Sequence, residues 1–262
     1  MLKYLFYFSL VFMLSACSEQ QILKTDSMKL LSSICKGADS QTLVIFDMDN
    51  VLTESQERAF QADLYEQIKN IVFDYKKVFK NLSPADQEKI KCEQWLIPVQ
   101  LVDYCMPKLI KTIQSRGVKT LMLTSNPCGK LGSIESIEEL CISRLEHFGI
   151  DFSKSWNISE QRLRDEENKS LGIFYKGGIF TMAAKPLALK SFLKQIPNCK
   201  FTKIIFIDDK KENLEKMLNF SKIRNLNYVG IEYSKVFTKK RPETDINAIK
   251  QNLKNLFQLS NL

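Results

Sequence analysis

Two pairs of aspartates are the residues of this chain whose types and positions point most directly to chemistry. Asp49 follows Asp47 by two positions, and Asp209 follows Asp208 directly. Each pair comes after a short run of β-branched and aromatic residues, which predicts a fully buried strand of a parallel sheet. Ligands of such sheets bind beyond the carboxyl ends of the strands. We therefore expect both pairs in one crevice, where their charge requires a cation, and Mg²⁺ is the usual cation for carboxylate oxygens beside a phosphate.

The elements that would position these pairs alternate along the chain. Short runs rich in apolar residues predict strands at residues 42–46, 118–123, 204–207 and 228–233. Apolar residues at helical spacing predict helices near residues 102–113, 134–148, 186–196 and 214–218. Gly-containing segments predict a further strand near 152–158 and a small β-hairpin near 173–182. Alternating strands and helices with short links predict an α/β fold, a Rossmann-like parallel sheet with right-handed crossovers.

A long insertion, residues 54–98, follows the first acidic pair and interrupts this alternation. It is rich in Gln, Glu, Lys and aromatic residues. Apolar residues recur at helical spacing from Phe60 to Val72, and Ser83 followed by Pro84 is a typical start for a second helix. We interpret the insertion as a helical cap within a domain of residues 41–262. Such a cap favours small substrates over macromolecules.

Further polar residues are expected at the same crevice. The second predicted strand leads into Thr124, Ser125 and Asn126, whose hydroxyl and amide groups are suited to bind a phosphoryl group. The hydroxyl of Thr124 or that of Ser125 could bind a phosphoryl oxygen, and the sequence leaves both open. Lys185 lies directly before a proline, which is favoured at the first position of a helix, so its ammonium is expected near the mouth of the crevice. Lys190, about one helical turn further on, is the alternative cation.

Taken in chain order, the two acidic pairs, Thr124 and Lys185 resemble the motif set of the haloacid dehalogenase (HAD) superfamily, with a phosphatase-type site. The resemblance covers about residues 42–232. It implies a HAD-like fold, an Mg²⁺ cofactor and a small phosphorylated substrate. Relatives often have Lys-Gly where this chain has Lys185 followed by Pro186.

The resemblance also implies roles for the four aspartates. Asp47 would be the nucleophile that forms an aspartyl-phosphate. Asp49 would protonate the leaving oxygen and then activate the hydrolytic water. The metal ligands would be Asp47, the backbone carbonyl of Asp49 and the carboxylate of Asp208, with Asp209 bound either directly or through a water molecule. Lys185 would neutralise the phosphate and position the nucleophile.

The N-terminus resembles a bacterial lipoprotein signal. Lys3 supplies a positive charge, residues 5–14 are apolar, and Leu14-Ser15-Ala16-Cys17 ends the segment. By this resemblance residues 1–16 would be removed and Cys17 would carry the lipid, with residues 17–40 forming a tether and an N-terminal helix. The apolar stretch is short for a membrane-spanning helix. We expect a membrane anchor in the bacterial envelope that faces the periplasm, with the outer membrane favoured over the inner one.

Two groups of bacterial proteins share parts of this pattern. Class C acid phosphatases, which are HAD-fold nucleotidases of the bacterial envelope, are similar in architecture and also carry lipoprotein signals. Short stretches of the core resemble more closely an uncharacterised HAD-like family of bacterial pathogens and symbionts. These stretches are residues 123–126, 177–180 and 206–209.

Composition excludes other classes of function. The formal net charge is +8, but the basic residues are spread along the chain without a basic block, so we expect no nucleic-acid partner. A zinc site and a histidine-based triad are not expected, because His147 is the sole histidine and no Cys-x-x-Cys pair occurs. Of the seven cysteines, the six beyond Cys17 would lie in a compartment that permits disulfides, and the sequence leaves their pairing open.

Two functional hypotheses follow. The first is an Mg²⁺-dependent phosphohydrolase that cleaves a small phosphomonoester through an aspartyl-phosphate, and the complete motif set favours it. The second is a non-catalytic envelope lipoprotein that uses the same fold to bind a phosphorylated ligand or a partner, and the large cap and the membrane tether motivate it.

Overall fold

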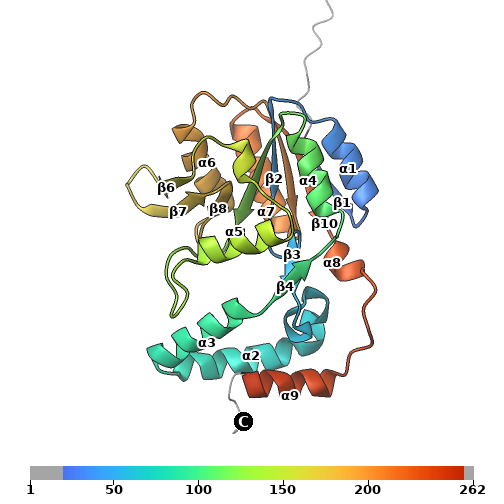
Figure 1. Ribbon diagram of the computed structural model, residues 1–262, viewed down its shortest axis with the longest axis vertical. Helices are drawn as coiled ribbons and strands as arrows, with labels where there is room; N and C mark the ends of the chain where they lie inside the picture. The colour runs from blue at the N-terminus through green and yellow to red at the C-terminus, as the bar shows by residue number, and fades with distance from the viewer. Residues whose placement is uncertain (1–19, 257–262) are drawn as a thin grey trace, which may run out of the picture.

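The computed structural model describes residues 20–256, with side chains described as far as residue 253. Within these residues, eight strands form one sheet in the order β1-β10-β9-β2-β5-β8-β7-β6 (Figure 1). Their bounds are β1 Gln20–Thr25, β2 Thr42–Phe46, β5 Lys119–Thr124, β6 Glu160–Arg164, β7 Ser170–Tyr175, β8 Gly178–Phe180, β9 Lys203–Asp208 and β10 Asn227–Tyr233. In this order, the six strands β1, β10, β9, β2, β5 and β8 run parallel to one another. Strand β7 is antiparallel to both of its neighbours, β6 and β8. The predicted α/β fold with a mostly parallel sheet is confirmed.

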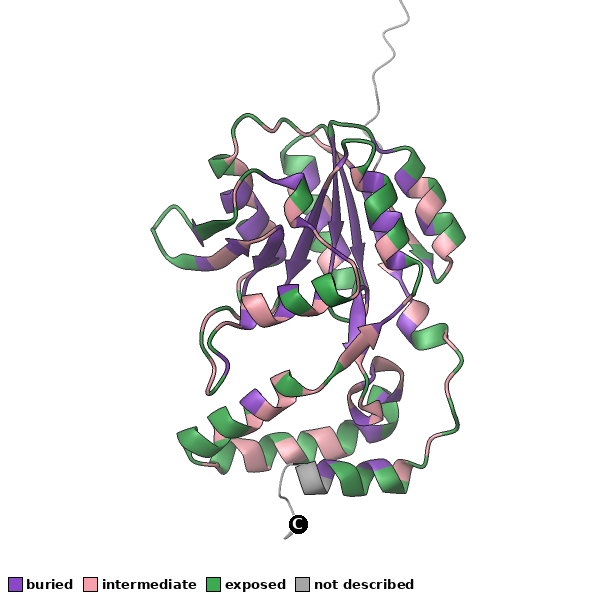
Figure 2. Ribbon diagram, viewed as in Figure 1, coloured by how far each residue is buried: buried purple, intermediate pink, exposed green. Residues whose placement is uncertain are grey.

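Helices cover both faces of the sheet, which explains the uninterrupted apolar strands. Val44 and Phe46 of β2 point into one core cluster and Leu43 and Ile45 into the other, so every residue of the strand is buried (Figure 2). The first cluster is covered by α1 Met28–Lys36, α4 Met106–Gln114 and α5 Ile137–His147. The second is covered by α6 Lys185–Gln195 and α7 Lys211–Ile223.

The start of the described chain differs from the expected tether. Residues 20–25 form β1, which pairs in parallel with β10 at the edge of the sheet. An edge strand is only half covered, so it tolerates the polar side chains that made this segment resemble a linker. The helix expected after it is α1, which begins after Ser27, whose side chain accepts a hydrogen bond from the backbone of Leu30.

A second layer of helices lies below the sheet in Figure 1. The residues of the expected insertion form α2 Tyr65–Asn81 and α3 Pro84–Leu96, preceded by the short 3₁₀ turns η1 Arg58–Phe60 and η2 Ala62–Leu64. The chain enters and leaves this layer through a two-stranded antiparallel ribbon, β3 Thr53–Ser55 with β4 Val99–Leu101. We call this layer the cap.

The C-terminal part of the chain also joins the cap, which the sequence analysis did not foresee. After α8 Lys235–Thr238 the chain descends to α9 Ile246–Leu256, drawn beneath α2 in Figure 1. Ile249 and Leu253 of α9 are buried against Ala59, Leu64 and Ile68. Because α9 is amphipathic and short, its fold depends on the apolar face that α2 and η1 offer.

The expected signal at residues 1–16 and the expected lipidation site Cys17 lie outside the described residues. In the part of the chain that is described, none of the helices combines the length and the hydropathy needed to cross a bilayer. Cysteines 35, 92, 105, 128, 141 and 199 are all free thiols.

Candidate active site

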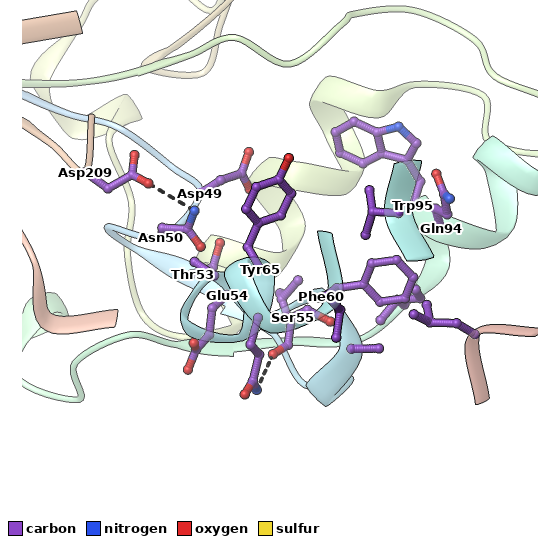
Figure 3. Close-up of a pocket in the computed structure, with 18 of the residues that line it drawn as sticks. Asp49, Asn50, Thr53, Glu54, Ser55, Phe60, Tyr65, Gln94, Trp95 and Asp209 are labelled. Carbon is purple, nitrogen blue, oxygen red and sulfur yellow. Dashed lines mark hydrogen bonds between the residues drawn. The ribbon is translucent and has the colours of Figure 1, made fainter. Parts of the chain in front are cut away.

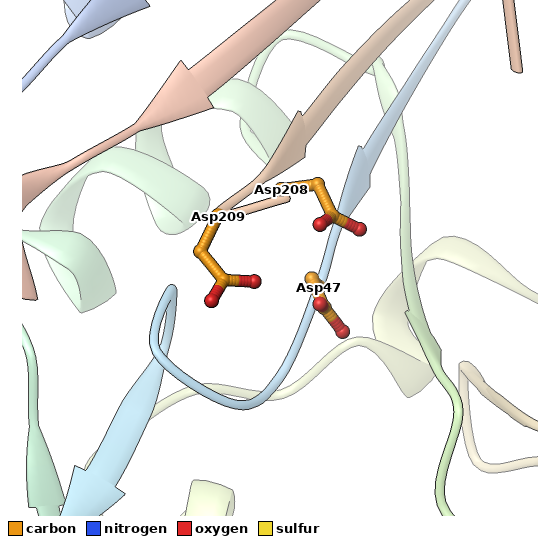
Figure 4. A group of neighbouring side chains, drawn as sticks. All are labelled: Asp47, Asp208 and Asp209. Carbon is orange, nitrogen blue, oxygen red and sulfur yellow. The ribbon is translucent and has the colours of Figure 1, made fainter. Parts of the chain in front are cut away.

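Three carboxylates meet at the carboxyl ends of β2 and β9. These strands are neighbours, and the register of Phe46 with Ile207 brings Asp47 and Asp208 side by side. Ligand oxygens of Asp47, Asp208 and Asp209 all lie within 4.8 Å of one another (Figure 4). A compact set of carboxylate oxygens suits a hard divalent cation. The sequence analysis expected these residues together, and the described triad can hold a metal ion.

Lys185 enters the same cluster from the first turn of α6. Its Nζ lies 2.8 Å from Oδ2 of Asp47 and 2.7 Å from Oδ2 of Asp208. The side chain is buried, with 3% of its surface exposed. Lys190, the alternative cation, instead pairs with Glu166 at the surface. The structure therefore brings Lys185 to the acidic cluster and leaves Lys190 away from it.

The cluster holds more negative charge than Lys185 balances. Burial, and then the nearby Asp208 carboxylate, raise the pKa of Asp47 well above its usual range, and Lys185 opposes this shift. Burial and Asp208 also raise the pKa of Asp209. For Lys185, burial acts to lower the pKa, but Asp47 and Asp208 outweigh it and the net shift is upward. A bound cation would offset the repulsion between the buried carboxylates, so the residues present fit a metal ion.

Hydrogen bonds fix the orientation of Asp47 and Asp208. The backbone N–H of Met48 donates to Oδ1 of Asp47 at 2.8 Å. Oδ1 of Asp208 accepts from the backbone N–H of Lys210 at 2.8 Å and from the amide of Asn213 at 3.0 Å. Asn213, on α7, was not singled out in the sequence. Its position five residues after Asp208, directly before the helix predicted near residues 214–218, is the signal that was available.

Asn50 is a second site residue that the sequence analysis missed. Its backbone φ is +64°, in the left-handed region that Asn tolerates better than most residues. Its side-chain amide donates to Oδ2 of Asp209 at 3.1 Å. The turn at Asn50 thus links the loop after β2 to the loop after β9.

Asp49 lies in the space between the sheet and the cap. It lines a pocket and is accessible from it, while Asp47 lies behind it and is buried. The enclosing protein raises the pKa of the Asp49 carboxyl, and a hydrogen bond with Asn126 partly offsets the rise. A carboxyl with a raised pKa in a pocket is suited to donate a proton.

The residues after β5 lie at the same edge of the sheet, since β5 neighbours β2. Thr124 ends the strand and is buried, whereas Ser125 is exposed. Asn126 lines the pocket, and its side-chain amide donates to Sδ of Met48 at 3.8 Å, next to Asp49 in the chain. Of the three residues after β5 that were predicted to bind phosphate, Asn126 lines the pocket, whereas Thr124 and Ser125 lie beside it in the chain at the end of β5 and do not line it.

The pocket runs from these residues into the cap and has a volume of about 910 Å³. Asp49, Asn50 and Asp209 stand at one end, and the cap residues Phe60, Gln94 and Trp95 stand around the other (Figure 3). This volume is within the range of sites that take small molecules.

A core helix holds the cap over this pocket. Arg144 of α5 donates to the carbonyls of Trp95 at 2.6 Å and Ile97 at 3.2 Å, at the C-terminal end of α3. The partial negative charge of a helix C-terminus favours a cation there. Glu88 of α3 adds a contact by accepting from the backbone N–H of Gly132 at 2.9 Å. These contacts join the cap to the core beside the pocket.

Comparisons with known proteins place the chain in a family. A family model described as "Protein of unknown function (DUF2608)" matches residues 24–261. The chain is 27% identical over 209 residues to the uncharacterized protein RP296 of Rickettsia prowazekii, covering 78% of this chain and 73% of that one. A solved structure from Burkholderia xenovorans, described as a haloacid dehalogenase-like hydrolase, covers 84% of this chain and 96% of its own at 13% identity and a TM-score of 0.38. Because the family model spans most of the chain, the protein belongs to the DUF2608 family.

Proposed function

We propose that this protein is an Mg²⁺-dependent phosphohydrolase of the HAD type that cleaves a small phosphomonoester through an aspartyl-phosphate on Asp47. The observation that carries the proposal is the bridge from Lys185 to Asp47 and Asp208 within an acidic triad, directly beside the pocket that Asp49 lines. This arrangement supplies a nucleophile, a proton donor and a metal site at one sheet edge.

Asp47 is held in position for attack on phosphorus. The Met48 N–H and the Lys185 ammonium fix its two oxygens at 2.8 Å each. In the first step a bond forms from Asp47 to phosphorus, the bond from phosphorus to the alcohol oxygen breaks, and Asp49 gives its proton to that oxygen. In the second step Asp49 takes a proton from the water that attacks phosphorus and releases Asp47.

Mg²⁺, held by Asp47, Asp208, Asp209 and the backbone carbonyl of Asp49, would screen the repulsion between the phosphate and the nucleophile. The hydroxyl of Thr124 or Ser125, with the amide of Asn126, would bind the phosphoryl oxygens. Lys185 would balance the charge that remains on them.

The proposal includes a location in the bacterial envelope. The apolar segment that ends in Leu14-Ser15-Ala16-Cys17 supports a lipid anchor on Cys17. The catalytic part would then face the periplasm, with the outer membrane favoured. Labelling with a fatty-acid analogue tests this directly: a labelled wild-type protein and an unlabelled Cys17→Ser variant are expected, and label on both would reject the anchor.

An activity assay tests the reaction itself. The mature protein with Cys17→Ser is expected to hydrolyse an aryl phosphate with Mg²⁺ and to lose this activity in EDTA. Asp47→Asn is expected to lower kcat by at least about 10³-fold, since the nucleophile is removed. Asp74→Asn, at an exposed pair with Lys77, is the matched control and should keep full activity. Full activity of Asp47→Asn would reject the mechanism.

A further inference from the structure

The half of the pocket that lies away from Asp49 and Asp209 is built mainly from apolar side chains of the cap. Phe60, Ile71 and Val72 come from η1 and α2, Trp95 comes from α3, and Leu253 comes from α9. Four elements of the cap therefore contribute to one wall of the pocket. The phosphate end lies on the opposite side, at Asp49 and Asp209 (Figure 3).

Two glutamines among the polar side chains that line the pocket are held by hydrogen bonds within the protein. The amide of Gln94 donates to the hydroxyl of Tyr75 at 3.2 Å. Gln61 donates to the carbonyl of Ser55 at 2.9 Å and accepts from Arg58 and Arg241 at 2.8 Å each. These bonds occupy the Gln61 amide and the donor group of Gln94, so neither is available to a hydroxyl of a sugar or to the edge of a base.

The charged side chains that line the pocket are also bound within the protein or exposed to solvent. Arg144 donates to two carbonyls of the cap, and the buried carboxylate of Glu54 is paired with Arg241. Lys76 lines the pocket from an exposed position on α2. A ligand with several hydroxyls would lose water here without gaining equivalent partners, which disfavours its binding.

We propose that the alcohol part of the substrate is bulky and largely apolar, as in an aryl phosphate or a medium-chain alkyl phosphate. The proposal rests on the phosphohydrolase function and names its substrate class. The phosphate occupies the end beside Asp49, and the apolar group extends along Ile71, Val72 and Trp95. Burial of each added methylene then favours binding about fourfold.

A chain-length series tests this substrate class. With the mature Cys17→Ser protein and Mg²⁺, kcat/KM is expected to rise at least about a hundredfold from ethyl to octyl phosphate, a conservative total for six methylenes. Glycerol 3-phosphate and ribose 5-phosphate should remain at or below the level of ethyl phosphate. A flat series, or faster cleavage of ribose 5-phosphate than of octyl phosphate, overturns the proposal and leaves the phosphohydrolase function intact.

Two substitutions on α2 distinguish the loss of an apolar contact in the pocket from a general effect of placing asparagine in this helix. Ile71 is half-buried and lines the pocket, whereas Phe73 is exposed on the same helix. Ile71→Asn is expected to lower kcat/KM for octyl phosphate by about tenfold while leaving ethyl phosphate within about twofold, in line with the loss of one buried apolar side chain. Phe73→Asn should change neither, and equal effects of the two variants count against the assignment.

A non-hydrolysable probe distinguishes this proposal from the reaction on which it rests. Calorimetry in Mg²⁺ compares octylphosphonate with methylphosphonate, and octylphosphonate is expected to bind at least about tenfold more tightly. If no ester is cleaved but this preference holds, the phosphohydrolase function fails and the apolar ligand class stands. If the two phosphonates bind equally, the apolar ligand class fails.

Discussion

At the scale of single residues, Lys185 is the group on which the charge balance of the site depends. It contacts Asp47 and Asp208 at once, and all three side chains are buried. Breaking a buried ion pair by removing one partner is strongly destabilising, because the remaining charge has no water to compensate it. Lys185 is therefore expected to serve stability as well as chemistry.

Replacing Lys185 with methionine should show both effects. In EDTA, Lys185→Met is expected to lower the free energy of unfolding by about 3–5 kcal/mol in urea titrations. Mg²⁺ should restore part of this loss, since a bound cation replaces the missing charge. Lys190→Met removes only an exposed pair with Glu166 and should stay within about 0.5 kcal/mol of wild type. Similar losses in both variants would show that the bridge contributes nothing specific.

The residues of the candidate site differ in how far the sequence could predict them. The four aspartates and Lys185 were identified because each follows a strand or starts a helix, so local pattern fixes their place. Asn50, Asn213 and Arg144 were missed. Asn50 depends on a left-handed turn, and Arg144 reaches the carbonyls of a distant helix, which no local pattern shows.

At the scale of elements, the cap is joined to the core by three stretches of chain. Two are β3 and β4, and the third is the segment from α8 to α9. The carboxylate of Glu54 on β3 is fully buried and pairs with Arg241 at 2.5 Å, with Lys239, and with the amide of Gln100 at 3.0 Å. All three stretches therefore meet at Glu54.

The substitution Glu54→Gln tests whether this junction holds α9 in place. Removal of the charge weakens the hold on Lys239 and Arg241, so local opening of the C-terminal segment should become easier. Amide hydrogen exchange is expected to speed up by at least about tenfold in α9, corresponding to roughly 1.4 kcal/mol. Exchange in β2 and β9 should not change.

Glu66→Gln is the matched control, since it breaks an exposed pair with Lys69 on α2. It should leave exchange in α9 at the wild-type rate. Unchanged exchange in Glu54→Gln would mean that apolar packing alone, through Ile249 and Leu253, fixes the helix.

Elements were predictable where their own sequence determines them. The apolar strands β2, β5 and β9 and the helices of the sheet layers follow from periodicity alone. Two elements depend on a partner instead: β1 is a polar edge strand completed by β10, and α9 is a short helix completed by α2 and η1. Their sequences carry no signal of these distant partners.

At the scale of the whole molecule, the sheet layer and the cap enclose the candidate site, and the exposure of each cysteine reflects how the chain packs. Cys35, Cys92 and Cys141 are buried, whereas Cys105 and Cys128 are exposed. Burial raises the pKa of Cys35 to about 12, and it also raises the pKa of Cys141. At pH 8 the thiols of Cys35 and Cys141 therefore hold almost no thiolate, which is the reactive form.

Reaction with a disulfide reagent should follow this order in the native Cys17→Ser protein. Cys105 is expected to react first, and Cys128 more slowly, because burial and then Glu138 raise the pKa of the Cys128 thiol. Cys35, Cys92 and Cys141 should react only after unfolding in urea, as peptide mass mapping would show. Fast labelling of the three buried thiols in the native protein, or disulfides between them, would contradict the packing described here.

The central claim is that Asp47 accepts a phosphoryl group with the help of a metal ion. Fluorine NMR of the protein with Mg²⁺ and beryllofluoride, a phosphoryl mimic, tests it most directly. The account predicts a bound fluorine signal in wild type and in Asp49→Asn, which keeps the nucleophile, and none in Asp47→Asn or in EDTA. No bound signal in wild type, or a signal that persists in Asp47→Asn, would contradict it.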